Sequence, residues 1–206
     1  MKMRWYINLH KVLTAPVVLA MMALHDQWEN PTAWVYLALH GTYGLLWVWK
    51  SRVFPDKSWE RQASLGFGLV IWLALTLYWI APWLITSGGV QAPYALLAVA
   101  ISLFVIGVFQ HFVTDMQKHT ALTLQPEHLI TTGMMARSRN LNYLGELLIY
   151  LALALLALHW LPLLVLVGYL VFVWAPNMRR KDRSLARYAE FDAYRRRTKW
   201  LIPYIG

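Results

Sequence analysis

The sequence alternates long apolar segments with shorter polar ones. Five apolar runs occupy Val12–Leu24, Trp34–Trp49, Ala63–Thr86, Ala92–Thr114 and Leu147–Ala175. A helix needs about 20 residues to cross a hydrocarbon core about 30 Å thick, so the runs predict membrane helices, the first two of them short for a span. The polar stretches 115–146 and 176–206 are too short for a separate soluble domain. We therefore expect one membrane domain over residues 1–206, with residues 1–114 forming the substrate side and residues 115–206 the cofactor side.

The last apolar run predicts a hairpin. As one helix, its residues would extend about 43 Å at 1.5 Å per residue and would carry the basic C-terminal segment to the other side of the membrane. His159-Trp160-Leu161-Pro162 places polar, aromatic and helix-interrupting residues midway along the run. The sequence thus predicts an all-α integral membrane fold of about six transmembrane helices, followed by a cytoplasmic basic tail. The last two helices would form a short hairpin with limbs of about 12 to 13 residues. One long tilted or kinked helix is the alternative.

The distribution of positive charge predicts the orientation. All 19 Lys and Arg residues lie before the first apolar run, in Lys50–Arg61, in Asp115–Arg139 or from Arg179 onward, and the two intervening loops have none. The positive-inside rule therefore places both termini in the cytoplasm. Because the net charge of +9 follows this pattern, it indicates topology, and we expect no nucleic-acid partner.

The composition is typical of a membrane protein and excludes several kinds of site. Hydrophobic residues make up 59% of the chain, charged residues 14%, and the mean hydropathy is +0.42. The absence of cysteine excludes disulfides, thiolate metal sites and iron–sulfur clusters. The seven histidines form no His-x-x-x-His or His-Glu-x-x-His pair, so we expect no metal site. Gly66-Phe67-Gly68 lacks the third glycine of a dinucleotide fingerprint.

Polar side chains within the apolar runs are candidates for chemistry, because such residues are costly in a membrane unless they line a cavity or pair. His40 and Tyr43 are three residues apart and share a helix face, as do His111 and Asp115, four apart. Hydrogen bonding between helices is the alternative role for His40 and Tyr43.

Three segments in the second half of the chain carry a resemblance. They are Asp115-Met116-Gln117-Lys118, Ser138-Arg139-Asn140-Leu141-Asn142-Tyr143-Leu144-Gly145-Glu146, and the basic tail from Asn177 to the terminal Leu201-Ile202-Pro203. This pattern resembles the superfamily that joins membrane steroid 5α-reductases and sterol reductases to isoprenylcysteine carboxyl methyltransferases and phospholipid methyltransferases. The resemblance implies a cofactor pocket made from the loop, the hairpin and the tail. It holds NADPH in the reductases and S-adenosylmethionine in the methyltransferases.

The reductase branch is the closer one and implies roles for individual residues. The implied cofactor-binding residues are Asp115, Gln117, Lys118, Arg139, Asn142, Tyr143, Arg179 and Tyr188. Glu146 would orient its neighbour or the substrate carbonyl, and Tyr43 or His40 would donate a proton. If Asn142–Glu146 begins a helix, both residues point into one pocket. Asp115 would form its other wall, and Arg179 would arrive from the end of the hairpin.

The methyltransferase branch is the alternative. His128-Leu129-Ile130-Thr131-Thr132-Gly133 is similar to the segment before that family's arginine-histidine-proline motif. However, Asn140 and Leu141 replace its histidine and proline, and Lys181 and Asp182 replace the paired glutamates.

The sequence therefore predicts an integral-membrane reductase that uses NADPH to reduce a conjugated double bond in a lipid-soluble, steroid- or isoprenoid-like substrate. An S-adenosylmethionine-dependent membrane methyltransferase is the alternative, and a non-enzymatic membrane subunit is the third reading. The nine basic residues from Arg179 onward suit an anionic cofactor, because arginine pairs bidentately with phosphate. A tail that only sets orientation and binds anionic lipid headgroups is the other interpretation.

Overall fold

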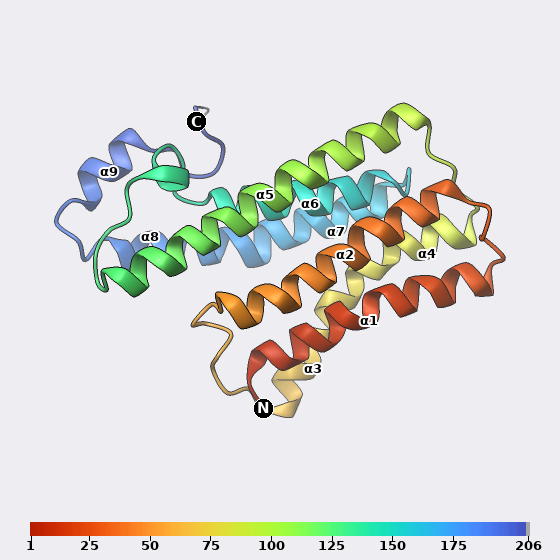
Figure 1. The fold of residues 1–206 in the computed structure, drawn as a ribbon, viewed down its shortest axis with the longest axis horizontal. Helices are drawn as coiled ribbons and strands as arrows, with labels where there is room; N and C mark the ends of the chain where they lie inside the picture. Colours follow the sequence, from red (N-terminus) through yellow and green to blue (C-terminus); the bar gives the residue numbers. More distant parts are fainter. Residues whose placement is uncertain (205–206) are drawn as a thin grey trace. The chain divides into compact units, whose positions relative to one another are not determined.

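The computed structural model describes residues 1–204, which form seven continuous helices (Figure 1). The elements are α1 Met3–Leu24; α2 Pro31–Val53; α3 Leu65–Thr76, continued through the 3-10 turn Leu77–Trp79 into α4 Ile80–Ser87; α5 Tyr94–Leu124; α6 Leu141–Leu155; α7 Trp160–Tyr169, continued through the π-helical turn Leu170–Trp174 into α8 Ala175–Leu185; and α9 Phe191–Arg197. The predicted all-helical class is confirmed.

Four of these helices are long and apolar enough to cross a membrane. They cover Met3–Leu24, Leu65–Ser87, Tyr94–Leu124 and Trp160–Leu185, and α6 is a shorter apolar helix of 15 residues. Several helices of this kind are typical of a multi-pass integral membrane protein. The helices that contain the first two apolar runs are longer than the runs themselves, since α1 has 22 residues and α2 has 23, but only α1 is among the four candidate spans. Both helices extend through buried polar residues, such as Lys11 and Lys50, which lie just outside the apolar runs.

The predicted hairpin in the last apolar run is confirmed. The helix breaks at residues 156–159, where Leu158 adopts a left-handed backbone conformation with φ of 47°. The rings of Tyr143, at the start of α6, and Trp174, at the end of the π-helical turn, have centroids 6.5 Å apart. The second limb therefore returns to the start of the first.

The second limb is longer than predicted, since its helix continues past Pro176 to Leu185. A proline inside a helix removes a hydrogen bond and crowds the carbonyl four residues earlier. Here the π-helical turn Leu170–Trp174 comes just before Pro176 and changes the hydrogen-bond register. The basic part of α8 is consequently a rigid extension of the hairpin.

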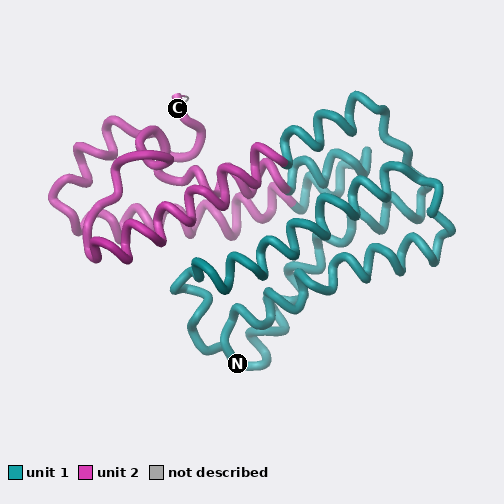
Figure 2. Tube along the Cα trace, viewed as in Figure 1, with its two compact units in different colours: residues 1–104, 150–165 teal, residues 105–149, 166–206 magenta. Residues whose placement is uncertain are grey.

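Two compact units divide the chain (Figure 2). Unit 1 comprises residues 1–104 and 150–165, and unit 2 comprises residues 105–149 and 166 onward. The sequence predicts one membrane domain with a substrate side over residues 1–114 and a cofactor side over residues 115–206. In the structure the tip of the hairpin belongs to unit 1.

Unit 1 is a helical bundle in which α1 contacts α2, α3 and α4, and α2 contacts α4. Helix α2 begins sharply because the Asn30 side chain accepts hydrogen bonds from the amides of Thr32 and Ala33, and Pro31 occupies the first turn. A Cβ at Gly44 would lie 2.4 Å from the Lys11 carbonyl oxygen. This glycine therefore allows α2 to approach the backbone of α1.

Unit 2 depends on an equally close approach of α5 and α6. A Cβ at Gly145 would lie 2.5 Å from the His111 amide nitrogen and 2.6 Å from the Gly107 carbonyl oxygen. The glycine of the Asn-Tyr-Leu-Gly-Glu segment thus brings the start of α6 against α5, next to the predicted site residues.

Candidate functional site

Two predicted site residues, Asp115 and Asn142, meet in unit 2. Asn142 Nδ2 donates a hydrogen bond of 3.2 Å to Asp115 Oδ1. His111 Nδ1 lies 3.0 Å from the Asn142 carbonyl oxygen, and because a carbonyl only accepts, we assign the proton to Nδ1. His111 Nε2 lies 3.8 Å from Asp115 Oδ2. We call Asp115, Asn142 and His111 the α5–α6 polar cluster.

One atom of this cluster is available to a ligand. The Asn142 side-chain oxygen is buried and has no hydrogen-bond partner within residues 1–204. Buried polar atoms in proteins are usually hydrogen-bonded, so an exception suggests a missing ligand or water. An N–H or O–H donor of a bound molecule would satisfy it. Within the described chain, no three His, Asp or Glu side chains are close enough together to hold a metal ion.

Other predicted residues surround the cluster. Asn142 and Glu146 both lie on α6, one helical turn apart, and Glu146 is half-buried. Lys118 lies one turn beyond the cluster on α5, also half-buried. Arg179 is exposed on α8, immediately after the hairpin.

Lys181 is a site residue that the sequence analysis did not select. It lies on α8, donates a hydrogen bond from Nζ to the Arg139 carbonyl oxygen, and is within electrostatic range of both Lys118 and Asp115. In the sequence, only its position two residues after Arg179 could have indicated Lys181 as a site residue.

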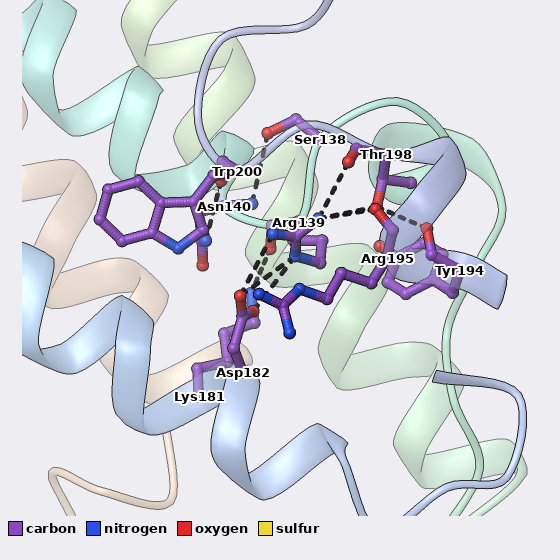
Figure 3. Close-up of polar contacts among 9 residues, drawn as sticks. All are labelled: Ser138, Arg139, Asn140, Lys181, Asp182, Tyr194, Arg195, Thr198 and Trp200. Atoms are coloured by element: carbon purple, nitrogen blue, oxygen red, sulfur yellow. Dashed lines mark hydrogen bonds and ion pairs between the residues drawn. The ribbon is translucent and has the colours of Figure 1, made fainter. Parts of the chain in front are cut away.

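Arg139, a predicted cofactor ligand, is occupied by protein groups (Figure 3). Its Nε and Nη2 atoms donate to the Asp182 carboxylate at 3.2 to 3.3 Å. Its Nη1 atom donates to the Thr198 carbonyl at 2.9 Å, to the Thr198 hydroxyl at 3.1 Å and to the Arg195 carbonyl at 3.3 Å. All three guanidinium nitrogens thus join the loop to the tail, which indicates a positioning role.

The residues beside Arg139 also bind the tail. Ser138 Oγ donates to the Leu201 carbonyl at 2.7 Å, and Asn140 Nδ2 donates to the Trp200 carbonyl at 2.9 Å. The Arg139 amide donates to the Lys199 carbonyl at 3.0 Å. Residues 198–201 therefore dock on the segment Ser138-Arg139-Asn140, and we call this segment the tail-docking strip.

Tyr194 reinforces this docking from α9. Its hydroxyl donates to the Met135 carbonyl at 2.8 Å. Burial raises the pKa of Tyr194 to about 12, so the phenol stays protonated and remains a donor at neutral pH.

Gln117 shapes the loop that precedes the strip. Its Nε2 donates to the Thr132 carbonyl, and its Oε1 accepts from the Met134 amide, both at 2.8 Å. Gly133, between them, has φ of +59°, and a Cβ there would meet the Gln117 amide. The predicted cofactor residue Gln117 thus holds a sharp turn in the structure.

A pocket of about 440 Å³ lies in unit 2 beside this loop. It is lined by Glu127, His128, Leu129, Thr131, Tyr188, Glu190, Ala193, Tyr194 and Arg197. The Tyr188 hydroxyl accepts a hydrogen bond of 2.9 Å from Arg187. The structure therefore brings Tyr188 together with His128, Leu129 and Thr131 around this pocket.

The predicted proton donors lie in the interior of unit 1. His40 and Tyr43 are almost fully buried, and the Tyr36 hydroxyl lies 2.9 Å from His40 Nδ1. Lys11, which the sequence analysis counted only as a topological charge, donates to the Tyr150 hydroxyl and lies over the Tyr43 ring. The hydropathy pattern does not predict this burial, because Lys11 immediately precedes the apolar run that begins at Val12.

Comparison with known proteins identifies a family. The model of a family described as "Protein of unknown function (DUF1295)" matches residues 17–198, most of the chain. A search of curated proteins found no match.

Proposed function

The chain belongs to the DUF1295 family, whose description gives no activity, and from its own residues we propose an integral-membrane NADPH-dependent reductase. Its substrate is a lipid-soluble molecule of the steroid or isoprenoid type, with a conjugated double bond. The proposal extends the resemblance of residues 115–203 to the superfamily of membrane steroid 5α-reductases and isoprenylcysteine carboxyl methyltransferases.

The observation that carries this proposal is the α5–α6 polar cluster with its unsatisfied Asn142 oxygen. The Asp115 carboxylate and the Asn142 amide oxygen are acceptors, which suit the carboxamide N–H and ribose O–H groups of a nicotinamide nucleotide. The resemblance had indicated both residues from separate parts of the sequence. Their contact supports a shared role.

The charges near the cluster suit the phosphates of the same cofactor. Lys118, Lys181 and the exposed Arg179 supply positive charge from α5 and α8. Arginine binds phosphate bidentately, and lysine binds it as a point charge. Arg139 is assigned to holding the tail against the loop, because Asp182 and the tail carbonyls already occupy its donors.

When bound, NADPH would supply a hydride to the substrate. The side chains then have to bind, orient and protonate. Asn142 and Asp115 would orient the nicotinamide end, and Glu146 would orient its neighbour or the substrate carbonyl. Reduction also consumes a proton, for which Tyr43 and His40 in unit 1 remain the proposed donors.

Thermal unfolding of the detergent-solubilised protein tests the proposal. A ligand at about 100 times its dissociation constant stabilises the folded protein by about 2.7 kcal/mol, so NADPH should raise the unfolding temperature and S-adenosylmethionine should not. Asp115→Ala and Asn142→Ala should abolish the NADPH effect. The matched controls Asp192→Ala and Asn177→Ala, on α9 and α8 outside the cluster, should retain it. Stabilisation by S-adenosylmethionine alone would exclude the reductase.

One observation favours the methyltransferase as a second candidate. The 440 Å³ pocket is lined by His128 and Thr131, from the segment similar to that family, and by Glu127 and Glu190. Carboxylates suit the ribose hydroxyls and the sulfonium charge of S-adenosylmethionine better than they suit a phosphate. If that cofactor stabilises the protein, Glu190→Gln should weaken the effect, whereas Glu29→Gln, in the 25–30 loop of unit 1, should not.

A further inference from the structure

Helix α1 packs against α3 in unit 1, and two neighbouring aromatic side chains at this contact have unsatisfied nitrogen atoms (Figure 1). His10, on α1, is only 1% exposed, and neither of its ring nitrogens has a hydrogen-bond partner among residues 1–204. The indole N–H of Trp72, on α3, is buried and has no partner within the same residues. The two rings stand edge to face, with centroids 5.3 Å apart. We call His10 and Trp72 the α1–α3 pair.

The polar groups next to the α1–α3 pair are already bonded to each other. The Trp79 indole N–H donates to the Thr14 hydroxyl at 3.1 Å, and that hydroxyl donates to the His10 carbonyl at 3.0 Å. The Trp79 ring stacks on the His10 ring, with centroids 4.4 Å apart. Near the start of α3, a Cβ at Gly68 would lie 2.2 Å from the Tyr6 ring, so α3 approaches α1 closely. These contacts hold the pair in position and leave its three nitrogen atoms unsatisfied.

A second histidine–tryptophan pair in unit 1 gives a direct comparison. The rings of His25 and Trp83 also stand edge to face, with centroids 4.9 Å apart. There, however, His25 Nδ1 lies 3.0 Å from the Thr86 hydroxyl oxygen, so the imidazole has a protein partner. Buried polar atoms are usually hydrogen-bonded, and an exception suggests a missing ligand or water. The α1–α3 pair therefore calls for a partner that residues 1–204 do not supply.

The chemistry of the three nitrogen atoms selects this partner. In its neutral form an imidazole has one N–H donor and one nitrogen that accepts, whereas an indole N–H only donates. A hydroxyl group both donates and accepts, so a single hydroxyl can donate to a His10 nitrogen and accept the N–H of Trp72. A carbonyl or ether oxygen only accepts, and it would leave the accepting nitrogen of His10 unsatisfied. The α1–α3 pair thus suits an alcohol.

The surroundings require the rest of the alcohol to be apolar. Both residues of the pair lie within candidate membrane spans, and hydrocarbon supplies no water to satisfy a buried polar group. Next to Trp72 on α3, Leu69 and Leu73 are 53% and 67% exposed, and an alkyl chain can lie along them. Because neighbouring rings cover His10, the ligand reaches it when the half-buried Trp72 ring turns aside.

We propose that the α1–α3 pair binds the hydroxyl group of a lipid alcohol, whose apolar chain lies along the exposed side of α3. Trp72 donates to the hydroxyl oxygen, and the hydroxyl donates to His10. The site lies wholly within unit 1. It does not depend on the proposed reductase function, because no nicotinamide takes part and the alcohol leaves the site unchanged.

Photoaffinity labelling of the wild-type protein in phosphatidylcholine nanodiscs tests this site. The probe is a hexadecanol derivative with a diazirine near its hydroxyl end. Light expels nitrogen from the diazirine, and the resulting carbene inserts into a neighbouring C–H or N–H bond. After digestion, mass spectrometry should locate adducts on α1 near His10 and on α3 near Trp72. Hexadecanol in excess should suppress these adducts, whereas hexadecyl methyl ether, which cannot donate a hydrogen bond, should suppress them several-fold less.

Two variants then test the role of the indole N–H. Trp72→Phe keeps an aromatic ring but removes the donor, and it should reduce the suppressible labelling near His10 several-fold. Trp83→Phe is the matched control, because Trp83 belongs to the pair whose histidine already has a protein partner, and it should label like the wild type. Equal suppression by alcohol and ether would overturn the proposal, as would adducts that never reach α1 near His10. Because both results come from the native sequence, the test does not depend on whether a variant folds.

Discussion

Gly145→Ala tests the close approach of α5 and α6 together with the candidate site. The added Cβ would lie 2.5 Å from the His111 amide nitrogen and 2.6 Å from the Gly107 carbonyl oxygen, and ordinary contact begins at 3.4 Å. Both atoms belong to the backbone, so α6 must move by about 0.9 Å to accept the methyl group. A shift of this size along the Asn142–Asp115 hydrogen bond would lengthen it to about 4 Å, beyond hydrogen-bonding distance.

The cost follows from these changes. Overpacking costs about 1 to 3 kcal/mol, a lost hydrogen bond to a carboxylate costs about 1.5 to 3 kcal/mol, and the better helix propensity of alanine returns about 1 kcal/mol. We expect a net loss of about 1.5 to 5 kcal/mol in the free energy of unfolding, together with loss of stabilisation by NADPH. Unfolding titrations with SDS, followed by tryptophan fluorescence, give the first quantity, and thermal unfolding with cofactor gives the second.

Gly168→Ala is the control, because Gly168 lies on the same hairpin and an added Cβ meets no atom within 4 Å. It should leave stability unchanged or raise it by up to about 1 kcal/mol. If Gly145→Ala is as stable as the wild type and still responds to NADPH, then α5 and α6 are not in backbone contact and the α5–α6 polar cluster is misplaced.

Two further predictions concern topology and the tail. The chain has no cysteine, so single cysteines can report exposure: a membrane-impermeant thiol reagent should label Gln27→Cys and Gly89→Cys from the extracytoplasmic side, and Lys57→Cys and Arg196→Cys only from the cytoplasm. Labelling of Gly89→Cys and Arg196→Cys from one side would contradict the orientation. Arg139→Lys cannot reproduce the forked contact with Asp182 and Thr198, so limited proteolysis should cut the tail near Thr198 faster than in the wild type. In the control Arg180→Lys, an exposed position on α8, the protease should cut the tail at the wild-type rate. If the tail of Arg139→Lys is also cut at the wild-type rate, the tail-docking strip does not hold the tail.

Much of the helical framework follows from the sequence, because a span needs a long apolar run and basic loops alternate with non-basic ones. The turn before Trp160 could be predicted for the same reason, since an unbroken helix would separate the basic tail from the other basic loops. Helix ends could not be predicted. Lys11 appears as a boundary in a hydropathy reading, whereas in the bundle it lies inside α1, surrounded by aromatic rings.

The candidate site was predictable in part. The resemblance selected Asp115 and Asn142, which the structure places in contact, but it also selected Arg139 and Gln117, which bind protein groups. Residues 198–201 dock on a strip about 60 positions earlier in the chain, and no local pattern records so distant a partner. Lys181 was missed for the same reason, because its contact with Arg139 depends on the returning limb of the hairpin.

The tail-docking strip also has a consequence for how the protein is made. Residues 138–140 leave the ribosome well before residues 198–201, so they must wait for most of the hairpin and tail to be synthesised before their hydrogen-bond partners exist. The spans before them can insert meanwhile, since a chain folds from its N-terminus as it emerges. The loop that carries Arg139 therefore reaches its final form only after translation has passed Leu201, and a ribosome stalled before that point would hold a chain whose tail-docking strip is still without its partners.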